Sequence, residues 1–173
     1  MNRRTLLQGL AAITALELIS GCTHANDAPA ASTTAGVALD RPHDYWRDKV
    51  SPAAYAVLFK EATERAGSSP LDKEQRAGTF VCAACHLPLF NNAAKFDSGT
   101  GWPSFTQPIA GSTKTRRDFK MILPRTEYHC ARCGGHQGHV FDDGPPPRGE
   151  RWCNNGVALR FVEKGQPLPP LRG

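Results

Sequence analysis

Residues 79–90 read TFVCAACHLPLF, two short runs of β-forming residues with a Cys-x-x-Cys pair between them. The same cysteine spacing returns in HCARC, residues 129–133. A Cys-x-x-Cys turn can present two thiolates to one ion, and two such turns complete a tetrahedral four-cysteine zinc site. The 44 residues between the pairs exceed the usual zinc-ribbon spacing, so we expect two distant hairpins that the fold brings together. The sequence thus predicts one structural Zn²⁺ per chain, held by Cys82, Cys85, Cys130 and Cys133.

Two other uses of these cysteines have to be weighed. A thioredoxin-like redox pair needs one Cys-x-x-Cys at a helix N-terminus after a strand, and neither pair has that context. Two structural disulfides could form in an oxidising compartment. We favour zinc, because metal binding contributes on the order of 10 kcal/mol to the folding of small domains. The neighbouring His86, His129 and His136 are not needed as ligands when four sulfur atoms are available.

The rest of the chain has the pattern of a β domain with one helix. After Gly78, the runs KMIL, YHC, HVF and VALRFV are rich in β-formers and are separated by Gly, Pro and Asn, which indicates antiparallel strands. Before them, Ser51 and Pro52 form a helix start, with Ser as the cap and Pro at the first helical position. Apolar residues then follow at helical spacing, so we expect a helix over residues 52–64.

Length and charge limit the function classes. A chain of 173 residues has room for one ordinary core but is short for two. The formal net charge is +5, and without the first 21 residues it is +4, from 19 Lys and Arg against 15 Asp and Glu. This excess is too small to indicate a nucleic-acid partner. The basic run KTRR, residues 114–117, is expected to be a solvated turn.

The N-terminus has the pattern of an export signal. Residues 1–22 read MNRRTLLQGLAAITALELISGC, with paired arginines, a moderately apolar stretch and small residues before Cys22. RRTLL resembles a twin-arginine signal, and ISGC resembles a lipoprotein cleavage box. We therefore expect residues 1–21 to be removed and Cys22 to be lipidated, with an ordinary signal and an unmodified cysteine as the alternative. Glu17 fits neither pattern well, since a carboxylate is costly in lipid.

A tether and a single folded domain are expected after this signal. Residues 22–42 are rich in Ala, Thr, Ser and Pro and show no apolar period, so we expect a lipidated Cys22 followed by a flexible tether. Such a tether spans only ~25 Å on average, which would keep the body near the membrane surface. No apolar stretch of ~18 residues follows, so no membrane span is expected in the body. We expect the folded domain over residues 43–164 and an irregular tail over residues 165–173.

The sixth cysteine, Cys153, has no obvious partner. A lone cysteine is usually an inert buried residue. Here it follows Arg151, precedes Asn154 and Asn155, and comes 14 residues after His139. Cationic neighbours lower a thiol pKa and raise the thiolate fraction. Composition alone therefore leaves a catalytic and a structural cysteine equally open.

Three longer stretches decide between them. DSGTGWPSF (residues 97–105), GGHQGHVFDDGP (134–145) and RWCNNGVALRF (151–161), with both Cys-x-x-Cys pairs in order, resemble the methionine-R-sulfoxide reductase B family. The resemblance covers about residues 44–163. It implies a mainly β fold of two antiparallel sheets arranged like a tent, with N-terminal helices. It also implies a four-cysteine zinc site remote from the active site.

The resemblance further implies a reaction and the residues that carry it. The activity is the reduction of methionine R-sulfoxide to methionine, with Cys153 as the nucleophile and a sulfenic acid as the intermediate. His139 is expected to act as the general acid or to polarise the sulfoxide oxygen. His136 and Asn155 are expected to hydrogen-bond in the same pocket, and Arg151 to support the thiolate. Without the resemblance, His136 and His139 would be interpreted as a hydrogen-bonded structural pair.

Trp102 and Phe105 are the expected substrate-binding aromatic residues. An indole face beside the methyl group of the substrate can fix which stereoisomer presents its sulfur to Cys153. Without the resemblance, both rings would be interpreted as core aromatics in a WPSF turn.

Several positions depart from the family pattern. Many relatives have a resolving cysteine where this chain has Thr100, and a threonine hydroxyl cannot form a disulfide with Cys153. We therefore expect direct reduction of the sulfenic acid by a thioredoxin-like protein or a small thiol, unless an unlipidated Cys22 reaches it. The other departures bear on rate and substrate preference: Trp152 for Tyr or Phe, Asn154 for an apolar residue, Gly156 for Ser and Gln137 for Leu.

Together these expectations describe an exported, zinc-stabilised, monomeric reductase, lipid-anchored on the periplasmic side of a bacterial cell envelope. Its substrates would be oxidised envelope proteins or free methionine R-sulfoxide. A non-catalytic binding module, in which Trp102 merely stacks on a ligand, is one alternative. A zinc-ribbon nucleic-acid binder is a second, which the export signal and the modest charge disfavour. Cys153 with His139 and Asn155 separates the reductase from the binding module, which requires none of them.

Overall fold

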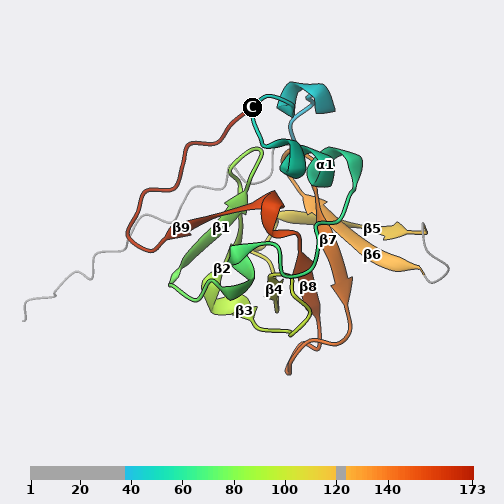
Figure 1. Cartoon of the computed structure of the whole chain (residues 1–173), viewed down its shortest axis with the longest axis vertical. Coiled ribbons are helices and arrows are strands. Elements are labelled where there is room, and N and C mark those ends of the chain that lie inside the picture. The colour runs from blue at the N-terminus through green and yellow to red at the C-terminus, as the bar shows by residue number, and fades with distance from the viewer. Residues whose placement is uncertain (1–37, 120–123) are drawn as a thin grey trace, which may run out of the picture. The chain divides into compact units, whose positions relative to one another are not determined.

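Nine strands form two antiparallel sheets in the part of the chain that the computed structural model describes, residues 38–119 and 124–173 (Figure 1). The smaller sheet has the order β2-β1-β9, and the larger has the order β3-β4-β8-β7-β6-β5. The predicted mainly β fold with two antiparallel sheets is therefore confirmed. The expected signal, the lipidation site Cys22, residues 23–37 of the expected tether and the run KMIL (120–123) lie outside the described residues.

The strands and helices are short. The strands are β1 (Gly78–Cys82), β2 (Pro88–Asn91), β3 (Lys95–Phe96), β4 (Ser104–Phe105), β5 (Thr113–Asp118), β6 (Arg125–Cys130), β7 (His136–Phe141), β8 (Arg151–Asn154) and β9 (Leu159–Glu163). The helices are α1 (Pro52–Lys60) and the 3₁₀ turns η1 (His43–Trp46), η2 (Pro70–Lys73), η3 (Asn92–Ala94) and η4 (Gly156–Ala158). None of the helices in the described residues is long and apolar enough to cross a membrane.

Helix α1 begins where the sequence predicts and ends four residues early. The Ser51 side chain accepts a hydrogen bond from Ala54 N at 3.1 Å, which confirms the predicted cap. At the other end Glu61 is left-handed, with φ 56° and ψ 33°, and the helix stops at Lys60. Helices often end in this way, but usually at a glycine, so no residue type at position 61 indicated the helix end. The consequence is that residues 61–67 form an irregular loop instead of a further helical turn.

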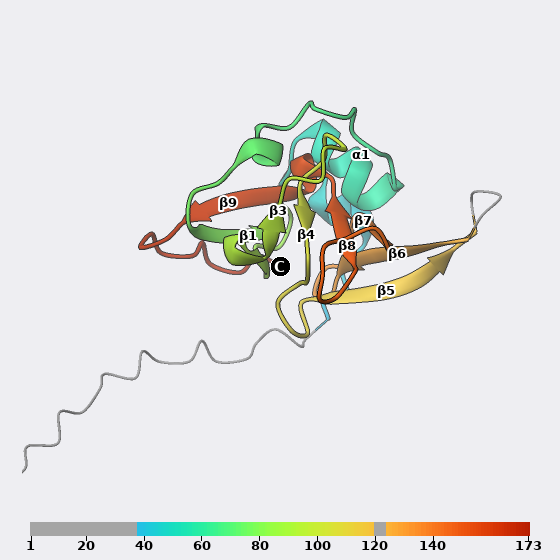
Figure 2. The same cartoon turned by 90° about the horizontal axis from the view of Figure 1, so that it is seen from below.

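The basic run KTRR is not the predicted turn. It lies inside β5, which forms the edge of the larger sheet, and its four side chains are exposed. Charged side chains are common on edge strands because they oppose further strand pairing. Figure 2 shows the β5–β6 hairpin extending away from the rest of the fold, on the side opposite β9.

Aromatic residues join the two sheets. Phe105 of the larger sheet stacks on Phe90 of the smaller sheet, with ring centroids 4.1 Å apart. Phe80 of β1 meets the same Phe105 ring edge-on at 5.0 Å. All three rings are fully buried, so each contributes about 1.5–3 kcal/mol of hydrophobic stabilisation. Helix α1 covers a different part of the core by packing against β7 and η4.

The C-terminal tail, predicted to be irregular, has no helix or strand after β9 but is held on the protein surface. The main-chain N–H of Arg172 donates to Cys85 O at 3.0 Å, and its guanidinium donates to Ala83 O at 2.5 Å. Pro170 O lies 2.9 Å from His86 Nδ1. The tail therefore binds the outside of the first Cys-x-x-Cys turn.

Candidate active site and metal centre

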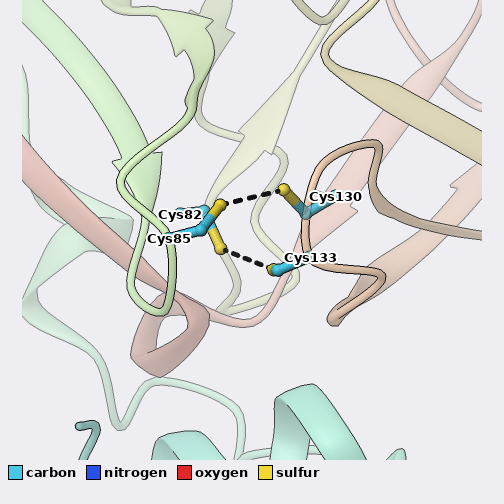
Figure 3. Close-up of side chains that lie close together, drawn as sticks. All are labelled: Cys82, Cys85, Cys130 and Cys133. Atoms are coloured by element: carbon cyan, nitrogen blue, oxygen red, sulfur yellow. Dashed lines mark hydrogen bonds between the residues drawn. The ribbon is translucent and has the colours of Figure 1, made fainter. Parts of the chain in front are cut away.

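The four predicted metal ligands meet in one buried cluster. Cys82 ends β1 and Cys130 ends β6, so each Cys-x-x-Cys pair lies on the turn that follows a strand. Figure 3 shows the two turns facing each other, with the sulfur atoms between them. Cys82 Sγ lies 3.6 Å from Cys133 Sγ, and Cys85 Sγ lies 3.5 Å from Cys130 Sγ. All four sulfur atoms lie within 4.8 Å of one another.

These distances fit a four-sulfur metal site. Tetrahedral zinc with ~2.3 Å bonds separates its ligand atoms by about 3.8 Å, close to the observed spacing. A disulfide requires about 2.05 Å between sulfur atoms, and all four cysteines are free. Neither pair lies at a helix N-terminus, as a thioredoxin-like pair would. The cluster contains no histidine.

The electrostatics of the cluster also call for a cation. Hydrogen bonds from the neighbouring sulfur atoms lower the pKa of Cys85, whereas hydrogen bonds to Cys130 and Cys85, together with burial, raise the pKa of Cys82 and Cys133 well above that of an ordinary thiol. Without a positive charge, the buried sulfurs therefore cannot all be thiolates. A divalent ion among them removes this conflict, because it stabilises every deprotonated sulfur at once. The donor set is thus consistent with a structural zinc site.

The second site is a small open pocket of about 150 Å³ beside β7 and β8. The antiparallel register of these strands places Cys153 directly opposite His139. Gly138 lets β7 and β8 lie this close together, because a Cβ atom on residue 138 would lie 1.9 Å from Cys153 O. Four predicted site residues line the pocket: Cys153, His139, Asn155 and Trp102. Besides Gly138, the wall contains three residues that no sequence pattern indicated: Thr63, Arg125 and Phe141.

An aspartate fixes the orientation of His139. Asp118 Oδ2 lies 3.0 Å from His139 Nε2 and accepts a hydrogen bond from Arg125 Nη2 at 2.7 Å. Because a carboxylate only accepts hydrogen bonds, the proton lies on Nε2 and leaves Nδ1 able to take up a second proton. Asp118 directly follows the basic run KTRR and comes 21 residues before His139. No motif or spacing in the sequence therefore predicted that the two side chains would be in contact.

His139 is neutral in the free protein at neutral pH. Burial lowers the pKa of its imidazole, while the hydrogen bond to Asp118 opposes that effect. His139 can therefore act as an acid only after it has received a proton within the site.

His136 lies next to His139 but does not line the pocket. Its ring meets the His139 ring edge-on at 5.4 Å between centroids, and its Nδ1 lies 2.6 Å from Glu127 Oε1. Its side chain is 4% exposed, and burial lowers the pKa of the imidazole. His136 thus packs behind His139, where it can support that ring without reaching a ligand in the pocket.

The Cys153 thiol differs from the predicted thiolate. Burial raises the pKa of Cys153, and the nearby Arg151 guanidinium lowers it by a smaller amount. Arg151 is already bound to Asp143, with its Nε and Nη2 atoms 2.8 and 2.9 Å from the two carboxylate oxygens. Arg151 therefore acts in the expected direction by favouring the thiolate, but burial outweighs it, so in the free protein the pKa of Cys153 lies above that of an ordinary thiol and the thiol is protonated at neutral pH.

Phe105 is placed in the core, not in the pocket wall. It is fully buried, stacks on Phe90 and lies opposite Trp152 in the strand register. This position matches the alternative interpretation of Phe105 as a core aromatic. Trp102, by contrast, is only partly buried and lines the pocket.

Two departures from the family pattern are in contact with each other. Asn154 Nδ2 donates to Gln137 Oε1 at 3.4 Å, and Asn154 Oδ1 accepts a hydrogen bond from the Tyr128 hydroxyl at 2.7 Å. Gln137 Nε2 in turn lies 3.6 Å from Cys82 Sγ. Both amides are fully buried. At two positions where the resemblance implies apolar residues, this chain has a polar pair that joins the four-cysteine cluster to the strand of Cys153.

A third departure, Gly156, has a local reason. A Cβ atom on residue 156 would lie 2.0 Å from the hydroxyl oxygen of Ser69. Ser69 is buried, and its hydroxyl accepts a hydrogen bond from Leu71 N at 3.2 Å. The Ser side chain that is usual in the family at position 156 has no room here, because Ser69 fills the space.

The amide pair should show strong thermodynamic coupling. We expect Gln137→Leu and Asn154→Ile each to lower the free energy of unfolding by about 1–3 kcal/mol, because each removes the hydrogen bond between two buried amides, and Asn154→Ile also removes the acceptor of the Tyr128 hydroxyl. The double variant should lose less than the sum of the two, by about 0.5–3 kcal/mol. Urea unfolding of the four proteins measures this difference. As a control, the losses from Gln137→Leu and from Gln75→Leu, a change at an exposed glutamine, should be additive. If the losses from Gln137→Leu and Asn154→Ile were additive as well, the coupling would be contradicted.

The protonated state of Cys153 predicts a distinct pH profile. Alkylation of Cys153 by iodoacetamide, followed by mass spectrometry of its peptide, should accelerate only at a pH above the ordinary thiol pKa of about 8.5. Arg151→Ala removes the cation that lowers the pKa, so the acceleration should move to still higher pH. Arg148→Ala, a change at an exposed arginine paired with Glu150, should leave the profile unchanged. A midpoint below 8 in the wild-type protein would refute the assignment.

Comparison with known proteins agrees with this geometry. The family model described as the SelR domain matches residues 50–163. A peptide methionine sulfoxide reductase MsrB of Bradyrhizobium diazoefficiens is 50% identical over 125 residues, which cover 72% of this chain and 90% of that protein. A protein of the same name from Leptospira interrogans is 43% identical over 127 residues, 73% of this chain and 97% of its own. The chloroplastic peptide methionine sulfoxide reductase B1 of Arabidopsis thaliana is 45% identical over 117 residues, 67% of this chain and 58% of that protein. The chain therefore belongs to the MsrB, or SelR-domain, family of peptide methionine sulfoxide reductases.

Proposed function

We propose that this chain, a peptide methionine (R)-sulfoxide reductase, returns methionine R-sulfoxide to methionine in the Cys153 pocket through a sulfenic acid on Cys153. The observation that carries the proposal is the convergence of Cys153, His139, Asn155 and the Trp102 indole in one pocket. A binding module would need the aromatic ring alone. It would have no use for a thiol facing a histidine that an aspartate orients.

The protonation states of the free site define a proton route. Cys153 starts as a thiol and His139 as a neutral imidazole whose Nδ1 can accept the thiol proton. Asp118, bonded to Nε2, stabilises the imidazolium that results. The thiolate then forms an S–S bond to the sulfoxide sulfur, and His139 returns the proton to the sulfoxide oxygen. The S–S bond and the S–O bond of the substrate then break as the hydroxyl passes to the Cys153 sulfur. Cys153 is oxidised by two electrons and keeps the oxygen as S–OH, while the substrate sulfur is reduced by two electrons to the thioether.

Trp102 provides the recognition of the methyl group. Its Nε1–H donates to Glu64 O at 3.2 Å, and this is the one hydrogen-bond donor of an indole. The bond therefore fixes the ring at the wall of the pocket. An aromatic surface there suits an S-methyl group, while the polar sulfoxide oxygen faces His139 and Asn155.

Regeneration of the thiol requires an external reductant. Thr100, at the position of the usual resolving cysteine, shares a hydrogen bond of 2.8 Å with Ser98, which shares another of 2.8 Å with Ser104. Apart from Cys153, the cysteines in the described residues all belong to the metal cluster. A thioredoxin-like protein or a small thiol would therefore reduce the sulfenic acid directly at the open pocket, without an internal disulfide.

One structural Zn²⁺ per chain is the proposed cofactor. Its ligands would be the four clustered sulfurs, and its charge would make all four of them thiolates. The cluster does not line the Cys153 pocket, so the metal takes no part in the sulfur chemistry. Its role would be to tie the end of β1 in the smaller sheet to the end of β6 in the larger sheet.

The cellular setting is proposed from the N-terminal sequence. The family match begins at residue 50, which leaves room before it for the twin-arginine-like signal, the lipidated Cys22 and the tether. Export in the folded state would allow metal loading in the reducing cytoplasm. The protein would then act as a monomer, anchored by lipid on the periplasmic side of the bacterial cell envelope, on oxidised envelope proteins or free methionine R-sulfoxide. No nucleic-acid partner is proposed, because the net charge is only +5.

Turnover of the separate R and S sulfoxides of a blocked methionine, with dithiothreitol as the reductant, tests the reaction. We expect the wild type to reduce the R isomer alone, and Cys153→Ser to lose activity by about 10³-fold or more, because the nucleophile is gone. Thr100→Ser, which keeps the hydroxyl, should retain the activity. Equal turnover by wild type and Cys153→Ser, or none by the wild type, would rule out the proposed reaction.

Metal analysis and unfolding test the cofactor. We expect about one zinc per purified chain. Cys82→Ser should lose the metal and its cooperative unfolding transition, because a contribution on the order of 10 kcal/mol is comparable to the whole stability of a domain. Cys153→Ser is the matched control and should keep both. A wild-type protein that folds cooperatively after chelation of all metal would contradict the assignment.

A further inference from the structure

The loop that follows α1 reaches into the active site from outside the family motifs. It comprises residues 61–67, which have no helix or strand. Thr63 forms part of the pocket wall. At the end of the loop, Gly67 N donates to Gly101 O at 2.7 Å, directly before Trp102 in the chain. The loop is therefore attached to the segment that presents the indole.

Glu64 in this loop is bonded through its carboxylate to the chain just beyond Cys153. Its Oε1 accepts a hydrogen bond from Gly156 N at 2.6 Å, and its Oε2 accepts one from Val157 N at 2.9 Å. Each oxygen thus has its own main-chain donor, and such charge-assisted bonds are stronger than neutral ones. The described residues contain no Lys, Arg or His in an ion pair with this carboxylate. Its position is therefore set by these two N–H groups.

The main chain of Glu64 is hydrogen-bonded to two side chains of the pocket, those of Asn155 and Trp102. Glu64 N donates to Asn155 Oδ1 at 3.0 Å, and Glu64 O accepts from Trp102 Nε1 at 3.2 Å. The remaining amide group of Asn155 donates to Gln137 O at 3.0 Å. The orientations of both the indole and this amide thus depend on where the backbone of residue 64 lies.

We propose, on the basis of the reductase function above, that Glu64 is a positioning residue that sets Trp102 and Asn155 relative to Cys153. Two diverging N–H donors require two acceptor oxygens, which a carboxylate has and an amide has not. If one of these bonds is lost, the backbone of residue 64 shifts, and the bonds to Trp102 and Asn155 shift with it. A displacement of about 1 Å at a catalytic site is enough to cost about 100-fold in rate.

The charge of Glu64 has a second, separable effect on Cys153. Burial raises the pKa of this thiol most, Arg151 lowers it, and the negative charges of Asp143 and Glu64 raise it. The other charged or titratable groups that line the pocket are His139 from β7 and Arg125 from β6. Removal of the Glu64 charge should therefore increase the thiolate fraction, although it weakens the geometry of the site. Unfolding would also expose this thiol and speed its alkylation, so the combination identifies the positioning role only in variants that remain folded.

The test compares wild type, Glu64→Gln and a control, Glu163→Gln, which alters an exposed glutamate paired with Arg76. For Glu64→Gln we expect kcat/KM for the R-sulfoxide of a blocked methionine to fall about 10- to 100-fold. We expect KM to rise because Trp102 is misplaced, and kcat to fall because Asn155 is misplaced. Alkylation of Cys153 by iodoacetamide at pH 7 should accelerate about two- to tenfold, since the thiolate is the reactive form. Glu163→Gln should match the wild type in every measurement.

A second variant and a spectroscopic signal keep the inference testable if Glu64→Gln does not fold. Glu64→Asp keeps the charge and both oxygens but is one methylene shorter, so it should lose kcat/KM without faster alkylation. The ¹⁵N-bound indole proton of Trp102, assigned with Trp102→Phe, should shift in either Glu64 variant. Folded Glu64 variants with wild-type kcat/KM, alkylation rate and indole signal would overturn the positioning role. An inactive wild type would overturn the proposed reaction instead, and the alkylation rates and indole signal would still test the position of Glu64.

Discussion

Four sulfur atoms from two turns, separated by 44 residues of sequence, meet at one point, and the remainder of the fold depends on that meeting. One turn follows β1 of the smaller sheet and the other follows β6 of the larger sheet. The sheets are small, and some strands have only two residues, so a metal ion held by the four sulfurs would limit how the sheets can move apart. The aromatic contacts of Phe105 with Phe80 and Phe90 lie along the same junction.

The active site is built on this framework by strand register. Antiparallel pairing of β7 and β8 sets Cys153 opposite His139, and pairing of β4 and β8 sets it opposite Ser104. These strands fix the proposed nucleophile, Cys153, and the histidine opposite it. Trp102 and Asn155 belong to less regular segments, and the loop after α1 binds both of them through Glu64. The site therefore combines two residues fixed by strand register, Cys153 and His139, with a pocket wall that side-chain and main-chain hydrogen bonds hold in place.

Burial and charge act against each other at the reacting pair. Desolvation favours the neutral form of both Cys153 and His139, although Arg151 and Asp118 each favour the charged form. The free site is thus poised as thiol and imidazole, with the proton that the reaction needs already in place. The residues that depart from the family pattern near this pair fit their surroundings. Asn154 donates a hydrogen bond to Gln137, and the missing side chain of Gly156 leaves space for Ser69.

The sequence by itself determined the features that depend on local pattern and on long shared motifs. The β-forming runs and paired cysteines predicted the fold class and the buried cluster, and Ser51 with Pro52 predicted where the helix starts. The family motifs placed Cys153, His139, Asn155 and Trp102 together, as the structure has them.

Only the tertiary structure decided the features that depend on distant contacts. Helix α1 stops at Lys60 because Glu61 turns left-handed, and the loop released there brings Glu64 to residues more than 90 positions away. Phe105 lies in the core, His136 lies behind His139, and KTRR lies in an edge strand, because neighbours far along the chain set their burial. The same holds for the thiol of Cys153: the sequence displays its cationic neighbour, but the desolvation that outweighs that neighbour exists only once the chain has folded around it.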